Sequence, residues 1–164
     1  MLPIEKIKQG TCSYFGTDTK RIHHALKVHN YCALIATLEG LNDQDKNLLE
    51  AAALLHDIGI KEAERKYHSS AGHYQEIEGP AIAKDLLTPY DVPHEILERI
   101  LFLIGHHHTY SAIDALDFQI LIESDFLVNA AEDNLSQEAV ATSYQKYFKT
   151  QTGRSLLESA FLSK

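Results

Sequence analysis

Residues 51–59 read AAALLHDIG, an apolar run that ends on a histidine, an aspartate and, two residues later, a glycine. The run Ala51–Leu55 is expected in the protein core, so the two polar side chains that follow it lie close to buried. Neutral imidazole and carboxylate are both good ligands for zinc, manganese, iron or nickel. The alternative is a helix terminus at which His56 meets the last carbonyl groups favourably. This stretch alone leaves open whether His56 and Asp57 bind a metal or only end a helix.

Apolar residues recur at three- and four-residue spacing through most of the chain, which is typical of helices. A first helix is expected at 25–38, and a second, capped by Asn42 or Asp43, runs to Gly59. Pro80 falls near a helix start, where a proline is tolerated. No run shows sustained two-residue alternation, so the sequence predicts an all-α, single-domain helical bundle over residues 1–164. The other expected helices are a short one within 61–72, and then 81–87, 93–104, 116–131, 138–148 and 155–162.

The overall charge of the chain argues against some classes of binding partner. Fifteen Lys and Arg residues stand against 23 Asp and Glu residues, a formal net charge of −8 with histidine neutral. Binding to a nucleic-acid duplex or to a membrane surface needs clustered Lys and Arg, so neither is expected. The two cysteines form no C-x-x-C pair, and no stretch approaches the ~20 apolar residues of a membrane span. A cytoplasmic protein is the expectation.

Three further positions place a metal-competent side chain on an apolar helix face. Asp125 lies within ILIESDFLVNA, where an ionised carboxylate is costly unless it is paired or binds a metal. A solvent-facing aspartate, or one that caps another helix, is the alternative there. His24 precedes Val28 by four residues and so shares its buried face. His107 follows Leu103 by four residues and continues a buried stripe, with a histidine-rich surface turn as the alternative.

Chance places one or two such residues on apolar faces, but four helices that each present one call for a common centre. Ten histidines are present in the chain. Six of them are expected to take no part in this centre, namely His23, His29, His68, His73, His94 and His108.

In chain order, the candidates are His24 in RIHHALKV, His56 and Asp57 in LLHDIG, His106 and His107 in LIGHHHTY, and Asp125 in LIESDFLV. This order resembles the H…HD…H…D pattern of the HD superfamily of metal-dependent phosphohydrolases, and the match covers about residues 20–130, followed by C-terminal helices at about 135–163. The resemblance implies an HD-type bundle that holds a divalent transition metal (iron, manganese, zinc, nickel or cobalt) through His24, His56, Asp57 and Asp125. It also implies that His106 and His107 line the side of a second metal or of the substrate.

The sequence departs from the family between the HD pair and the later histidines. Binuclear members have a further histidine there, and Gln75 stands about where that residue falls, in HYQEIEGPAIA. Glu76 is the expected substitute ligand, with His73 as the other choice, so one metal site is expected and a second stays open. The Gly-Tyr-Pro signature of the cyclic-dinucleotide branch is absent, and the chain is most similar to the small, single-domain bacterial type.

The resemblance implies hydrolysis of a nucleotide or another small phosphoester, a reaction of EC class 3.1, by a metal-activated water. Asp57 would ligate the metal and orient or deprotonate that water, and His107 would give a proton to the leaving oxygen. Lys27 and Lys61 are expected to meet the phosphate of this small substrate, with a solvated surface charge as the alternative for each. The alternative function is a non-catalytic, metal- or nucleotide-binding sensor module. Whether the chain forms a homodimer is left open.

Overall fold

The computed structural model describes residues 1–163, and over that range it consists of helices and loops. The predicted all-α class is therefore confirmed. None of the described helices is long and apolar enough to cross a membrane. The helices are α1 (Ile4–Phe15), α2 (Thr19–Leu38), α3 (Asp43–Leu55), α4 (Ile60–Tyr67), α5 (Gly72–Leu87), α6 (His94–His106), α7 (Leu116–Glu132), α8 (Gln137–Tyr147) and α9 (Gln151–Leu157), with short turns η1 (Thr88–Tyr90), η2 (Tyr110–Ala112) and η3 (Glu158–Leu162).

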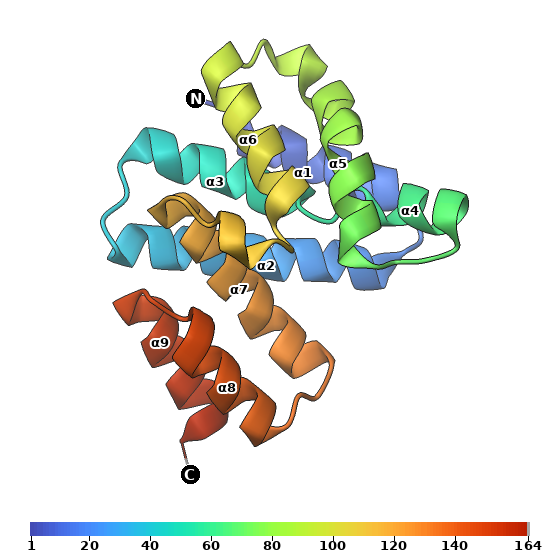
Figure 1. Cartoon of the computed structure of the whole chain (residues 1–164). Coiled ribbons are helices and arrows are strands. Elements are labelled where there is room, and N and C mark those ends of the chain that lie inside the picture. Colours follow the sequence, from blue (N-terminus) through green and yellow to red (C-terminus); the bar gives the residue numbers. More distant parts are fainter. Residues whose placement is uncertain (164) are drawn as a thin grey trace.

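The long helix α2 runs through the middle of the molecule and packs against both α3 and α7 (Figure 1). Asp18 caps its first turn, because the Asp18 side chain accepts a hydrogen bond of 3.3 Å from the backbone N–H of Arg21. The helix thus begins at Thr19, earlier than the sequence pattern predicts. His24 consequently lies in its second turn and is buried against the core.

Helix α3 carries the apolar run into the centre of the core, where Ala51–Leu55 are all buried. Asn42 caps it as predicted, with its side-chain oxygen 2.9 Å from the backbone nitrogen of Asp45. The helix ends at Leu55, and Gly59 caps the start of α4 instead of ending α3. A Cβ atom on Gly59 would lie 2.5 Å from the backbone oxygen of Gln75. A glycine is therefore required where this turn passes against α5.

The expected position of Pro80 near a helix start is wrong. Helix α5 begins at Gly72 and continues through Pro80 to Leu87. A proline in a helix interior removes one backbone hydrogen bond. Packing against α6 outweighs that loss, since α5 lies close enough that a Cβ on Gly105 would be 3.3 Å from the Pro80 ring. Helix α1 was not expected from the pattern, although Ile7, Thr11 and Phe15 form its buried stripe at four-residue spacing.

Helices α8 and α9 form the C-terminal part of the described chain, below α7 in Figure 1. Helix α9 starts at Gln151, four residues before the expected Ser155. The reason is the cap at Thr150, whose hydroxyl oxygen accepts a 2.9 Å hydrogen bond from the backbone N–H of Gly153.

Two acidic side chains from the body of the molecule hold the start of α9. The buried Glu123 of α7 accepts hydrogen bonds from the backbone N–H groups of Lys149 and Thr150, at 2.9 and 3.1 Å. Glu39, which follows α2, accepts one from the backbone N–H of Thr152 at 2.7 Å. The first N–H groups of a helix have no partners within it, and Glu39 satisfies the one of Thr152. Glu123 holds the two residues just before the helix, so the two carboxylates tie the start of α9 to α2 and α7.

Candidate metal centre

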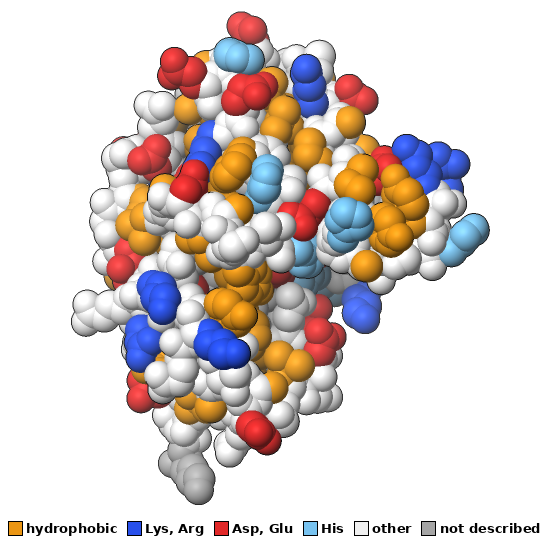
Figure 2. All heavy atoms as spheres, viewed as in Figure 1, with side chains coloured by type: hydrophobic (Ala, Val, Ile, Leu, Met, Phe, Trp, Pro, Cys, Tyr) orange, Lys and Arg blue, Asp and Glu red, His pale blue; other side chains and the backbone are white. Residues whose placement is uncertain are grey.

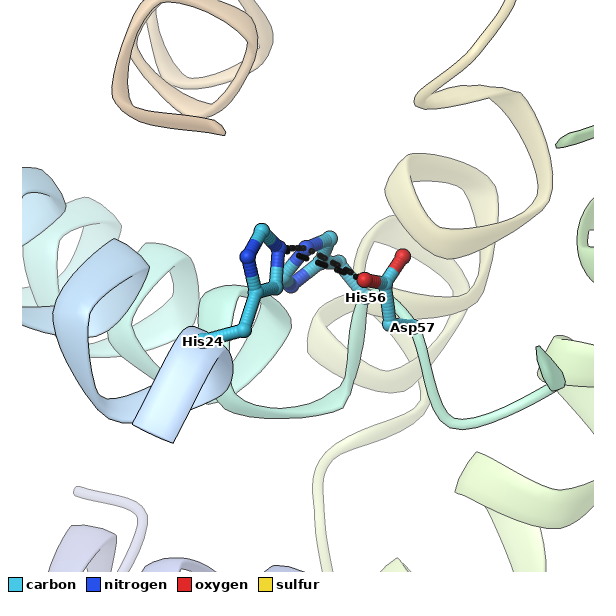
Figure 3. A group of neighbouring side chains, drawn as sticks. All are labelled: His24, His56 and Asp57. Atoms are coloured by element: carbon cyan, nitrogen blue, oxygen red, sulfur yellow. Dashed lines mark hydrogen bonds and ion pairs between the residues drawn. The ribbon is translucent and has the colours of Figure 1, made fainter. Parts of the chain in front are cut away.

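Four side chains from three parts of the chain converge beside the end of α3. His24 comes from α2, His56 and Asp57 from the turn after α3, and Asp125 from α7. The Nε2 atoms of His24 and His56 are 3.2 Å apart. Each Nε2 atom also lies 3.1–3.4 Å from one carboxylate oxygen of Asp57 and one of Asp125. Figure 3 shows His24 on α2 directed toward His56 and Asp57, which are adjacent in the turn after α3.

The position of His56 follows from where α3 ends. Its Nδ1 atom donates a 2.7 Å hydrogen bond to the backbone oxygen of Ala53, one of the carbonyl groups left without a partner at a helix C-terminus. In a neutral imidazole with Nδ1 protonated, Nε2 carries a lone pair. That lone pair faces the cluster. His56 can therefore end the helix through Nδ1 and bind a metal through Nε2 in the same geometry.

His24 is oriented in the same way by a residue that the sequence pattern did not single out. Its Nδ1 atom lies 3.3 Å from a carboxylate oxygen of Glu132, at the end of α7. Glu132 stands two turns after Asp125 on the same helix, and this spacing is the signal that would have found it. An acceptor at Nδ1 leaves the Nε2 atom of His24 free to face His56 and Asp125.

The donor set fits a divalent transition metal. Two Nε2 lone pairs 3.2 Å apart, each within 3.4 Å of one oxygen of Asp57 and one of Asp125, repel those neighbours unless a proton or a metal cation lies between them. Ligand atoms at about 2.1 Å from a metal stand roughly 3.0–3.4 Å from their neighbours in tetrahedral or octahedral geometry, which matches the spacing of these atoms. Asn129 also donates a 3.1 Å hydrogen bond to Asp125, a supporting contact typical of ligating carboxylates.

The acid–base properties of the cluster show how strongly it attracts positive charge. Burial disfavours the charged form of His56, but the negative charges of Asp57 and Asp125 outweigh burial and raise its pKa to about 9. The pKa of His24 is raised as well, because the hydrogen bond that its ring donates to Asp125 and nearby negative charge outweigh its burial. Burial opposes ionisation of Asp57 and Asp125, yet the histidines lower both pKa values.

Of the three consecutive histidines, the structure brings His107 and His108 to the cluster and leaves His106 outside it. One ligand atom from each of Asp57, His107 and His108 lies within 4.8 Å of the others. The Nε2 atom of His107 is 3.3 Å from Asp57, and its Nδ1 donates to the Ile104 oxygen at 2.8 Å. His108 was expected to take no part. That expectation came from the helical pattern, which no longer predicts side-chain direction once α6 ends at His106.

His106 turns away from the other two. Its ring stacks on Phe102 with centroids 4.3 Å apart, and its Nδ1 donates to the Phe102 carbonyl oxygen.

Glu76, expected as a substitute ligand, is also outside the cluster. Both of its carboxylate oxygens accept hydrogen bonds from the hydroxyl of Thr109, at 2.8 and 3.0 Å. His73 is exposed. Gln75 does lie at the site: its side-chain oxygen is 3.4 Å from the Nε2 of His108, and its amide nitrogen donates to the backbone oxygen of Ser70.

The two lysines expected to meet phosphate lie away from the centre of the site. Lys61 contacts α1, since its amine donates to the Tyr14 backbone oxygen at 3.3 Å and lies over the Tyr14 ring. Lys27 is exposed and pairs with Glu132 at 3.5 Å. A pocket of about 390 Å³ opens over His24, Asp57 and Asp125, and Lys20 and Arg21 are the cations that line it.

Comparisons with known proteins identify the family and the fold. A sequence model of the family described as HD domain matches residues 21–145 of the chain. The chain is similar to the crystal structure of a predicted HD superfamily hydrolase from an uncultured Thermotogales bacterium, with a TM-score of 0.69 and 21% sequence identity over 96% of this chain and 84% of that one. At this level of identity, the similarity shows a shared fold. No curated protein matches the chain.

Proposed function

Because the chain belongs to the HD domain family, we propose that it is a metal-dependent phosphohydrolase that cleaves a nucleotide or another small phosphoester, a reaction of EC class 3.1. The observation that carries the proposal is the convergence of the Nε2 atoms of His24 and His56 with carboxylate oxygens of Asp57 and Asp125. These four residues would hold one divalent metal, with iron, manganese, zinc, nickel and cobalt all suited to the donor set. Such a cation supplies Lewis-acid polarisation of a phosphoryl oxygen and acidifies the attacking water.

The reaction needs a base near the water and a proton for the leaving group. The water oxygen forms a bond to phosphorus, the bond from phosphorus to the alcohol oxygen breaks, and the alcohol takes up one proton. Asp57 is the proposed catalytic base, because one of its oxygens faces His24 and the other lies beside His107.

His107 is the proposed proton donor. It is buried between two acceptors, the Ile104 carbonyl oxygen at 2.8 Å and Asp57 at 3.3 Å. An imidazole at this position would give a proton to the leaving oxygen.

The test combines metal analysis with a screen of nucleotide and sugar phosphates in the presence of each candidate metal. We expect about one transition metal per chain and hydrolysis of at least one phosphoester. Asp57→Ala and Asp125→Asn should lose metal and activity together, whereas Glu76→Gln and His106→Gln should retain both, because the structure places those side chains outside the cluster.

Two results would contradict the proposal. A wild-type protein that takes up no metal would remove its basis. A metal-loaded protein that hydrolyses no phosphoester would instead favour a non-catalytic sensor module.

A further inference from the structure

The charges around the candidate pocket are unevenly placed. Lys20 and Arg21 stand in the first turn of α2, and Glu132 and Asp133 stand at the end of α7, where Glu132 pairs with Lys27 of α2 at 3.5 Å. A helix C-terminus carries partial negative charge, so these two acids add to a wall that is already negative. With the two charges of a divalent metal set against Asp57 and Asp125, Asp18 pairs with Arg21 and Glu132 with Lys27, so Asp133 is the acid among the described lining residues that has no cation within ion-pair distance.

The charge of Arg21 is already balanced by its neighbours. Its guanidinium group forms hydrogen bonds with both carboxylate oxygens of Glu64, one of them at 3.0 Å, and an ion pair of 3.0 Å with Asp18. Bidentate pairing of this kind holds the guanidinium in place. Among the described residues that line the pocket, Lys20 is therefore the cation left without a carboxylate in ion-pair distance, and it is exposed.

The start of α2 does not supply a further anion site. Helix N-termini favour phosphate because their first N–H groups are free and their partial charge is positive. Here the Asp18 carboxylate accepts the hydrogen bond from the Arg21 N–H and brings its own negative charge to that place. A second or third phosphate group would meet Asp133 without an unpaired arginine among the described lining residues to balance it.

We propose, on the basis of the function proposed above, that the substrate is a phosphomonoester with a single phosphate group, and that nucleoside diphosphates and triphosphates are selected against. One phosphate carries about −1.5 to −2 charge at neutral pH, and the metal together with Lys20 can balance it. Sites that bind triphosphates use several cations and a cradle of backbone N–H groups. The pocket volume of about 390 Å³ lies toward the small end of the usual range for ligand sites, roughly 300–1,000 Å³.

The test compares AMP, ADP and ATP, which share one nucleoside and differ in the number of phosphates. Release of adenosine and of each phosphate product is measured with the metal-loaded wild-type protein under matched free-metal concentrations. At low ionic strength, kcat/KM for AMP should exceed the values for ADP and ATP by at least about tenfold, and the ratio should narrow as salt screens the pocket charges. Equal or faster hydrolysis of ADP or ATP would overturn the proposal.

A charge-reversal variant locates the cause of the selection. Asp133→Lys should raise kcat/KM for ATP relative to AMP severalfold. Glu98→Lys makes the same change in net charge on α6, at an exposed position outside the pocket, and should leave the ratio unaltered. If Asp133→Lys behaves like Glu98→Lys while circular dichroism shows both folded, the acidic wall is not the source of selectivity.

If the metal-loaded protein hydrolyses none of the three nucleotides and no other phosphoester, the proposed function fails and this inference is tested by binding alone. Calorimetric titration with AMP and then with ATP is free of turnover in that case. Tighter binding of AMP supports the charge argument, and equal or tighter binding of ATP overturns it.

Discussion

The Nδ1 atoms of the histidines at the site decide what their Nε2 atoms can do. His56 and His107 each donate from Nδ1 to the backbone oxygen three residues earlier, at 2.7 and 2.8 Å. Both residues follow directly on a helix that has just ended, where carbonyl groups lack partners. His24 lies within a helix whose carbonyl groups are already bonded, so it depends on the Glu132 side chain instead. A histidine just after a helix end is thus oriented by a backbone carbonyl of that helix, whereas a histidine inside a helix needs an acceptor from another side chain.

This difference makes Glu132 a positioning residue with a measurable effect. Glu132→Ala removes the acceptor at Nδ1 of His24 and should weaken metal affinity by about 10–100-fold, the usual range for loss of such a supporting contact. Glu132→Gln keeps an oxygen acceptor and should lose less. Competition with a chromophoric chelator measures both affinities, and Glu98→Gln, at an exposed position outside the pocket, is the control. Equal affinity in Glu132→Ala and wild type would show that His24 needs no such partner.

The raised pKa of His56 predicts opposite pH dependences for the metal-free and metal-bound protein. Its pKa is about 9 in the fold and about 6.5 in an unfolded chain. Protonation of His56 therefore stabilises the metal-free fold fully below about pH 6.5, and this stability is lost as pH rises through 9. The expected loss between these pH values is about 2–3 kcal/mol.

Because a metal must displace the proton, metal affinity should rise about tenfold per pH unit over the same window. Urea unfolding of chelator-treated protein at pH 6.5, 7.5 and 9 measures the stability, and metal titration at the same pH values measures the affinity. A metal-free protein whose stability is constant or increases toward pH 9 would contradict the raised pKa.

At the level of helices, Glu123 connects the site-bearing helix α7 to the start of α9. Glu123 stands two residues before Asp125 on α7, is buried, and accepts from the backbone of Lys149 and Thr150. A Cβ atom on Gly153 would lie 2.8 Å from the Glu123 carboxylate, so a glycine at that position of α9 permits the close approach. The carboxylate is therefore built into the junction between α7 and α9.

Glu123→Ala leaves buried N–H groups without an acceptor and should lower the free energy of unfolding by about 2–3 kcal/mol. Glu123→Gln retains one side-chain oxygen and should lose less than half of that amount. Glu138→Ala, at an exposed position in the first turn of α8, should change stability by less than about 0.5 kcal/mol. Chemical denaturation compares the three variants, and a loss in Glu123→Ala no larger than that of Glu138→Ala would show that the junction does not depend on this carboxylate.

The helices also differ in how well the sequence predicts them. Strong local signals predicted α3 with its Asn42 cap, α6 after Pro93 and the apolar α7. The sequence pattern gave the wrong helix boundary where tertiary packing determines the boundary, as in the continuation of α5 through Pro80. It also failed beyond the end of α6, where three adjacent histidines share one sequence context but point to different partners, His106 to Phe102 and His107 to Asp57.

Across the whole molecule, the family resemblance predicted the fold and the main His–Asp cluster, but not the charges around it. Lys61 follows the HD pair closely in sequence, yet its side chain extends to Tyr14 on α1. Lys20 and Glu132 come from opposite ends of different helices and meet at the pocket only in the folded chain. On the face shown in Figure 2, Lys and Arg side chains occur in small, separate groups among acidic ones. The balance of charge at the pocket is therefore a property of helix packing and not of any single motif.

The long distance in sequence between the residues of the cluster affects the kinetics of folding. His24 and Asp125 lie 101 positions apart in sequence and 3.1 Å apart in space. Closing so long a loop is costly in entropy and is expected late in folding, so we expect the metal ligands to be assembled after the transition state. Metal should then slow unfolding in proportion to its stabilising effect and leave the refolding rate almost unchanged. Stopped-flow measurements with and without metal test this order of events, and a refolding rate that rises with metal concentration would place the cluster in the folding nucleus.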